Sequence, residues 1–145
     1  MSLQRRSDWQ SRFASFLISH RHHYFSYGTW DCGLFVADAI QAMTDQDLAA
    51  PFRGKYSSSS QVRKAIRKYA GSPSVRALAE QIAIEHKMPE VKILRARRGD
   101  LVLFKRPRDY SFGLVDLNGR DVIVISSSGL SRLPVADAFR AWKVG

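Results

Sequence analysis

Apolar residues recur every three or four positions over the first ninety residues, which is the period of an amphipathic α-helix. This pattern predicts four helices, at about 8–19, 32–43, 61–70 and 75–86. Ser7 and Asp31 are the expected N-caps of the first two helices. Gly71 suits the left-handed residue that ends the third helix. The first part of the chain is therefore predicted to be helical.

From Gly99 onwards the pattern changes to short apolar runs separated by turn signals, which is typical of β-strands. The predicted strands are 101–104, 112–115, 122–125, 130–133 and 142–144, and residues 134–141 are expected to form a helical turn. Asn118-Gly119 is a strong hairpin signal. The sequence thus predicts one α+β domain over residues 1–145. Its helical half, at about 7–90, packs on one side of a small antiparallel sheet formed by the β half, at about 99–145.

At 145 residues, of which 45% are apolar, the chain has the size and composition of one domain with a single packed core. No apolar run approaches the roughly 20 residues that a membrane-spanning helix needs, so we expect no membrane insertion. The N-terminus lacks the apolar core and the cleavage site of a secretory signal. Cys32 is the single cysteine and cannot form an internal disulfide, which fits synthesis in a reducing cytoplasm.

The chain is strongly basic, with 23 Lys and Arg against 13 Asp and Glu and a net charge of +10. Two basic clusters lie at 53–68 and 95–108. The simplest interpretation is a solvated basic surface that favours anionic partners. A nucleic-acid-binding module is an alternative, with Phe104 and Tyr110 as stacking residues. Against it, Phe104 belongs to an apolar strand, so we expect its ring to be buried.

The segment from Gly28 to Phe35 carries the strongest chemical signal. Cys32 is expected in the first turn of a helix, where the helix dipole favours a negative sulfur and hence a nucleophile. Gly33 would let a substrate backbone approach closely. Trp30 and Asp31 flank the thiol, and we place them with Gly33 around the expected substrate groove, although Asp31 also suits an N-cap. The alternative for Cys32 is a small buried residue on the apolar helix stripe.

Several short motifs resemble the NlpC-type branch of the papain-like cysteine peptidases, over about residues 9–145. They are Tyr27-Gly28, Asp31-Cys32, Phe35-Val36, Ala39, Arg98-Gly99-Asp100-Leu101-Val102, Phe112-Gly113-Leu114 and Ala141-Trp142-Lys143-Val144. The resemblance implies a papain-like fold in which an Asp-Cys pair opens a helix that packs on an antiparallel sheet. It also implies cleavage of peptide bonds in peptidoglycan. In particular, the chain is similar to a small phage and prophage tail-associated branch of that superfamily.

Carried over residue by residue, the resemblance gives Cys32 the nucleophile position and places Ser111 where the catalytic histidine stands. A serine hydroxyl is far too weak a base to accept a thiol proton near neutral pH. The third polar position falls near Ile125 or Ser126, and neither orients an imidazole well.

Four histidines remain as substitute bases. His86 is a weak candidate that suits a surface position at a helix C-terminus, and the others lie in an expected loop at His20, His22 and His23. We expect no metal site and no cofactor, because no acidic or cysteine residue is clearly placed to complete a metal site with the three loop histidines.

These observations lead to the hypothesis of a degenerate peptidoglycan hydrolase that serves as a structural or assembly component of a phage or prophage tail tip. The expected partners are other tail proteins, such as the hub or the distal tail protein, together with peptidoglycan. An active cysteine endopeptidase or amidase that cleaves cell-wall peptides during DNA entry is one alternative, and the basic nucleic-acid-binding module is the other. We expect synthesis in the bacterial cytoplasm and a final place in the virion tail.

Overall fold

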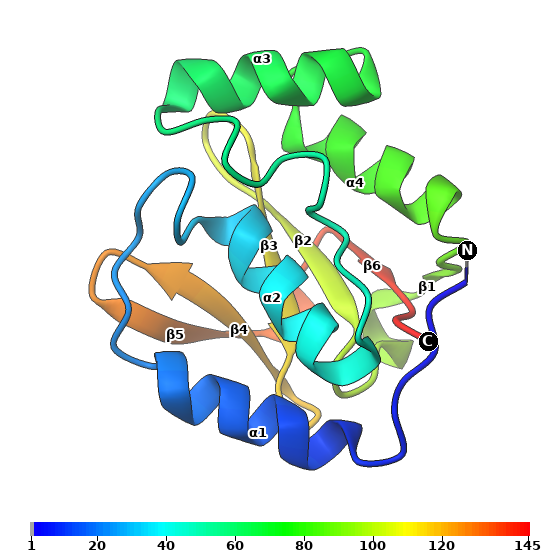
Figure 1. The fold of residues 1–145 in the computed structure, drawn as a ribbon. Helices are drawn as coiled ribbons and strands as arrows, with labels where there is room; N and C mark the ends of the chain where they lie inside the picture. The colour runs from blue at the N-terminus through cyan, green and yellow to red at the C-terminus, as the bar shows by residue number, and fades with distance from the viewer. Residues whose placement is uncertain (1) are drawn as a thin grey trace.

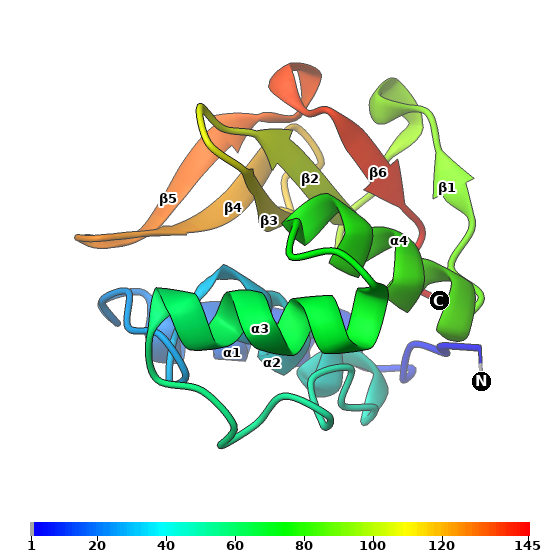
Figure 2. The ribbon, with the colours of Figure 1, turned by 90° about the horizontal axis from the view of Figure 1, so that it is seen from above.

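The computed structural model describes residues 2–145, which form four α-helices and a six-stranded antiparallel sheet (Figure 1). The helices are α1 (Trp9–His20), α2 (Cys32–Thr44), α3 (Ser59–Ala70) and α4 (Val75–Glu85). Seen from above, the four helices lie on one side of the sheet (Figure 2). The α+β class and this layer arrangement are therefore as the sequence predicts. No helix within residues 2–145 is long and apolar enough to cross a membrane.

The sheet has the strand order β1-β6-β2-β3-β4-β5. Its strands are β1 (Glu90–Val91), β2 (Leu101–Lys105), β3 (Tyr110–Val115), β4 (Asp121–Ser126), β5 (Gly129–Pro134) and β6 (Arg140–Trp142). Two short 3-10 helices, η1 (Ile93–Arg95) and η2 (Val135–Asp137), flank the sheet. The predicted helical turn after residue 134 is thus confirmed. The last strand begins and ends two residues before the predicted 142–144, and β1 was not predicted.

The helix boundaries follow local capping, with two differences from the sequence prediction. Asp31 caps α2 through a hydrogen bond from the Leu34 amide, and Gly71 ends α3 in the left-handed conformation, as predicted. The N-cap of α1 is Asp8 rather than Ser7, and its side chain makes no capping hydrogen bond. The third helix begins two residues earlier than predicted because the Ser58 hydroxyl accepts a hydrogen bond from the Gln61 amide.

Helix α2 lies between α1 and strands β3 and β4, and this position explains why most of its side chains are buried. Phe35, Ala39, Ile40 and Met43 are completely buried there. The opposite face of the sheet has a second, smaller core that includes Phe104, which is 4% exposed. The predicted burial of Phe104 is therefore confirmed, and its ring does not present a free stacking surface.

A buried carboxylate joins the two ends of the chain. One Asp100 oxygen accepts hydrogen bonds from the Arg5 guanidinium, at 2.9 Å, and from the Val144 amide, at 3.1 Å. The other accepts from the Arg97 amide at 2.9 Å. Arg5 also donates to the Val144 carbonyl at 2.6 Å. Asp100 thus anchors the start of β2, and it holds the N-terminal segment against the C-terminal one.

Replacing Asp100 with Asn is expected to lower the free energy of unfolding by about 3 kcal/mol, because the Arg5 charge would stay partly buried without its counter-charge. The matched control is Asp8→Asn, which removes an exposed ion pair with Arg12 and should cost about 0.5 kcal/mol or less. Urea unfolding followed by circular dichroism measures both values. Equal losses in the two variants would contradict a structural role for the Asp100 contact.

Candidate functional site

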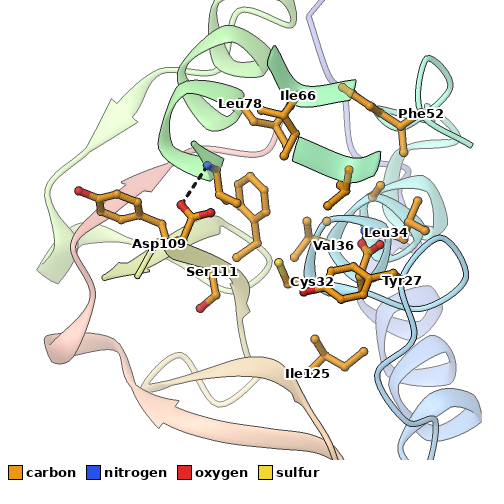
Figure 3. Close-up of a pocket in the computed structure, with 18 of the residues that line it drawn as sticks. Tyr27, Cys32, Leu34, Val36, Phe52, Ile66, Leu78, Asp109, Ser111 and Ile125 are labelled. Carbon is orange, nitrogen blue, oxygen red and sulfur yellow. Dashed lines mark hydrogen bonds between the residues drawn. The ribbon is translucent and has the colours of Figure 1, made fainter. Parts of the chain in front are cut away.

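Cys32 and Ser111 come together at one cavity, although 79 positions separate them in the chain. Cys32 is the first residue of α2, and the backbone amide of Phe112 in β3 hydrogen-bonds to its sulfur. Ser111 directly precedes Phe112, and both residues line the cavity shown in Figure 3. The Ser111 side chain shares a face of the sheet with its pairing partner Phe104, which belongs to the second core, so its hydroxyl points away from Cys32. The start of α2 therefore faces the strand that carries Ser111.

The Asp31 carboxylate holds the start of α2 in place and is only 5% exposed. One of its oxygens accepts from the Leu34 amide at 2.9 Å, and the other accepts from the Gly28 amide, at 3.1 Å, and from the Tyr56 hydroxyl. A buried carboxylate with three donors is well satisfied. Asp31 lines the cavity, as the predicted groove position requires, but its hydrogen bonds give it a structural role.

Gly28 brings the segment before α2 into direct contact with the segment before α3. Its φ is +81°, a region that favours glycine. A Cβ atom at this position would lie 2.1 Å from the Tyr56 carbonyl oxygen, which is far inside van der Waals contact. Only glycine therefore permits the approach that brings Tyr56 to Asp31.

The cavity has a volume of about 870 Å³ and lies between α2, α3, α4 and β3. Its interior is apolar, and side chains from all four elements and from β4 contribute (Figure 3). Examples are Leu34, Val36, Ile66, Leu78, Phe112 and Ile125. Residues that both line the cavity and are exposed to solvent mark its mouth; they include Tyr27, Arg63, Arg106 and Arg108. The half-buried Cys32 thiol is thus part of the wall of a largely apolar space.

Burial raises the pKa of the Cys32 thiol to about 11. Hydrogen bonds from the Phe112 and Gly33 amides act in the opposite direction, but they are outweighed by burial and by the charges of Asp31 and Asp109. The thiol is therefore protonated at neutral pH. This corrects the expectation that the helix N-terminus favours a negative sulfur. Removing a thiolate from water costs more free energy than the helix dipole contributes to its stability.

None of the four histidines lines this cavity among the residues that the structure describes. His20 stacks on Trp30 with ring centroids 4.9 Å apart, and His23 meets the same ring edge-on at 5.1 Å. His22 is exposed. No group of three or more potential metal ligands occurs within residues 2–145.

His86 differs from the exposed residue that the sequence predicts. It is the C-cap of α4 and half-buried, its Nδ1 atom has no hydrogen-bond partner within the described part of the chain, and burial lowers its pKa. The structure therefore does not bring this substitute base to the cavity that contains the thiol.

The remaining predicted site residues divide between the cavity and the core. Trp30 is buried against Phe16, His20 and Phe35 and is not among the described residues that line the cavity, so it does not wall a groove beside Cys32. Gly33 does line the cavity. A Cβ there would meet nothing closer than Asp31 Oδ1, at 3.5 Å, so packing alone does not demand this glycine.

The predicted base position and the predicted third position hold neither an imidazole nor a carboxylate. The Ser111 hydroxyl accepts a hydrogen bond from Arg106 Nε at 3.0 Å. At the predicted third position, Ile125 lines the cavity and Ser126 does not. Sequence reasoning missed Tyr56 as the partner of Asp31, and it recorded Arg63, Arg106 and Arg108 only as members of basic clusters. The fold is what brings all three to the lining of one cavity.

The family model described as Domain of unknown function (DUF6950) matches residues 4–144. The chain belongs to this family. The matched range includes all the helices and strands described above. No curated protein matches the chain.

Alkylation of Cys32 by iodoacetamide in the folded protein is expected to accelerate with pH up to about 11, because only the thiolate reacts. Near pH 8 the folded chain should react about a hundredfold more slowly than the chain unfolded in urea, whose thiol has an ordinary pKa of about 8.5. Mass spectrometry of timed samples gives both rates. A plateau below pH 8 in the folded protein would show an ionised thiol and contradict the effect of burial.

Proposed function

We propose that this chain is a papain-like domain of the NlpC type that acts as a structural component of a phage or prophage tail and not as a peptidase. Its partners would be other tail proteins, such as the hub or the distal tail protein. The observation that carries the proposal is the placement of Cys32 at the start of α2, opposite the strand β3 that carries Ser111, with no imidazole among the described residues that line the cavity.

The surroundings of the thiol support the absence of hydrolysis. A cysteine peptidase needs a group that takes the thiol proton before attack. Ser111 is a very weak base, and the hydrogen bond from the cationic Arg106 to its oxygen opposes protonation further. The raised pKa of Cys32 acts in the same direction.

The alternatives receive less support from the same observations. A cell-wall peptide has many backbone amide groups, and the apolar interior of the cavity would leave them without hydrogen bonds. A nucleic-acid module of the stacking type would need exposed aromatic rings near the basic clusters, but Phe104 is buried and Tyr110 is half-buried. The structural role is therefore the one that we propose.

Purified protein incubated with peptidoglycan is expected to release no more soluble fragments than the Cys32→Ala variant, and both should match the enzyme-free blank. Fragments can be measured by liquid chromatography and mass spectrometry. The parent chain is also expected to co-elute with a tail hub or distal tail protein in size-exclusion chromatography. Release that depends on Cys32 would overturn the structural role, and elution as a free monomer beside each tail component would contradict the proposed partners.

Restoring an imidazole tests the papain-like placement directly. Ser111→His is expected to accelerate Cys32 alkylation at pH 6 by about tenfold or more, since a cationic imidazole that reaches the sulfur stabilises the thiolate. The gain should disappear above about pH 8, where the ring is neutral. The control is Ser60→His, an exposed α3 position that does not line the cavity, which should react at the parent rate at both pH values. An unchanged rate at pH 6 in a folded Ser111→His protein would show that position 111 does not occupy the place of a base.

A further inference from the structure

The cavity next to Cys32 has the size and lining of a small-molecule site. Its volume of about 870 Å³ lies within the range of about 300–1,000 Å³ that such sites occupy. The interior wall consists mainly of buried aliphatic side chains from α2, α3 and α4. They include Leu34, Val36, Ile40, Ile66, Leu78 and Ile82. A ligand that fills this space must therefore carry a sizeable apolar part.

The mouth of the cavity is cationic. Arg63, Arg106 and Arg108 line it from α3 and from the segment between β2 and β3, and all three are exposed. Arg106 also donates to the Ser111 hydroxyl, and its guanidinium lies over the Phe104 ring. Within residues 2–145, neither Arg63 nor Arg108 forms an ion pair. Asp31 and Asp109 are the carboxylates among the described residues that line the cavity; Asp31 is hydrogen-bonded at the start of α2, and Asp109 Oδ1 accepts from the Val75 amide at 3.2 Å. The charges at the mouth therefore favour an anion.

Helix orientation adds to this positive field. Cys32, Ser59 and Val75 are the first residues of α2, α3 and α4, and all three line the cavity. The N-terminus of a helix carries a partial positive charge. The ends of α2 and α4 already hold the carboxylates of Asp31 and Asp109, whereas α3 is capped by the neutral Ser58. The start of α3, together with the arginines, therefore gives an electrostatic reason to bind a negative group beside an apolar space.

We propose that this cavity binds a single acyl chain with an anionic head group, such as a long-chain carboxylate. The chain lies in the apolar interior, and the head lies at the mouth between Arg63, Arg106 and Arg108. Binding is reversible, and the protonated Cys32 thiol acts as a small apolar part of the wall. A peptide in the same place would bury unpaired backbone groups, and a neutral lipid would leave the arginines unused.

Affinity for a series of saturated carboxylates from eight to sixteen carbons measures the fit. The full chain is loaded with cis-parinaric acid, a fluorescent long-chain carboxylate, and each compound is added as competitor. Affinity should increase by about fourfold per methylene until the cavity is filled. Hexadecanol, which has the chain but no charge, should bind at least tenfold more weakly than palmitate.

Two triple variants test the mouth. Replacing Arg63, Arg106 and Arg108 with Gln should weaken palmitate binding at least tenfold. The matched control replaces Lys64, Arg67 and Lys68 with Gln, which removes the same charge from the exposed face of α3 outside the cavity and should change affinity less than twofold. Both sets lie on the surface, and circular dichroism checks that both variants fold. Mass spectrometry of the loaded protein should show no adduct on Cys32, as reversible binding requires.

The interior is tested by filling it. Ala37 is buried in α2 and lines the cavity, so Ala37→Leu should shift the best-binding chain to a shorter length. If this variant does not fold, the proposal is tested by the length series on the parent chain and by the two triple variants.

Further competitors distinguish the possible head groups of the acyl ligand from a membrane surface. Dodecyl phosphate and dodecanoate distinguish a phosphate from a carboxylate head, and displacement by either supports the proposal. Binding to phosphatidylglycerol vesicles without displacement by any free amphiphile would overturn it in favour of a membrane surface. Equal loss of affinity in both triple variants, no dependence on chain length, displacement only by an apolar peptide, or no binding of the probe would also overturn it. These results do not depend on peptidoglycan release, so this proposal and the proposed function can fail separately.

Discussion

The buried Asp31 carboxylate is the contact on which the site depends. A charge in the protein interior is tolerated only when hydrogen bonds replace its hydration, and Asp31 receives them from the Leu34 amide, the Gly28 amide and the Tyr56 hydroxyl. These three donors belong to α2, to the loop before it and to the segment before α3. One side chain therefore caps the helix, fixes Cys32 against β3 and positions one wall of the cavity.

The chemistry of Cys32 is decided by a competition between two effects of its position. A helix N-terminus stabilises a negative group by about 0.3–1 kcal/mol, and by about 2 kcal/mol in favourable cases. One pKa unit corresponds to about 1.4 kcal/mol, and full burial can raise the pKa of an acid by several units. Burial prevails, and the pKa of the thiol is about 11. The charges that act on the thiol within residues 2–145 are those of Asp31 and Asp109, which do not reverse this balance, and the thiol is part of an apolar wall.

Two groups among the basic residues have different roles in the structure. Arg5, Arg53 and Arg140 form ion pairs with neighbouring carboxylates and stabilise the fold. Arg63 and Arg108 have no such partner within residues 2–145 and stand with Arg106 at the mouth of the cavity. The net charge alone does not separate these roles, because pairing depends on side chains that are distant in the sequence.

The sequence by itself determined the elements that rest on local interactions. The helical period, the Asp31 cap, the Gly71 terminus and the Asn118-Gly119 turn each act within a few residues, so they predicted four helices and most of the sheet. The two-residue strand Glu90–Val91 was missed because its stability comes from pairing with β6. The protonated thiol, the aromatic packing of Trp30, the half-buried His86 and the apolar cavity with its arginines were decided only by tertiary structure. Burial and long-range pairing set these properties, and neither is encoded in the pattern of a single segment.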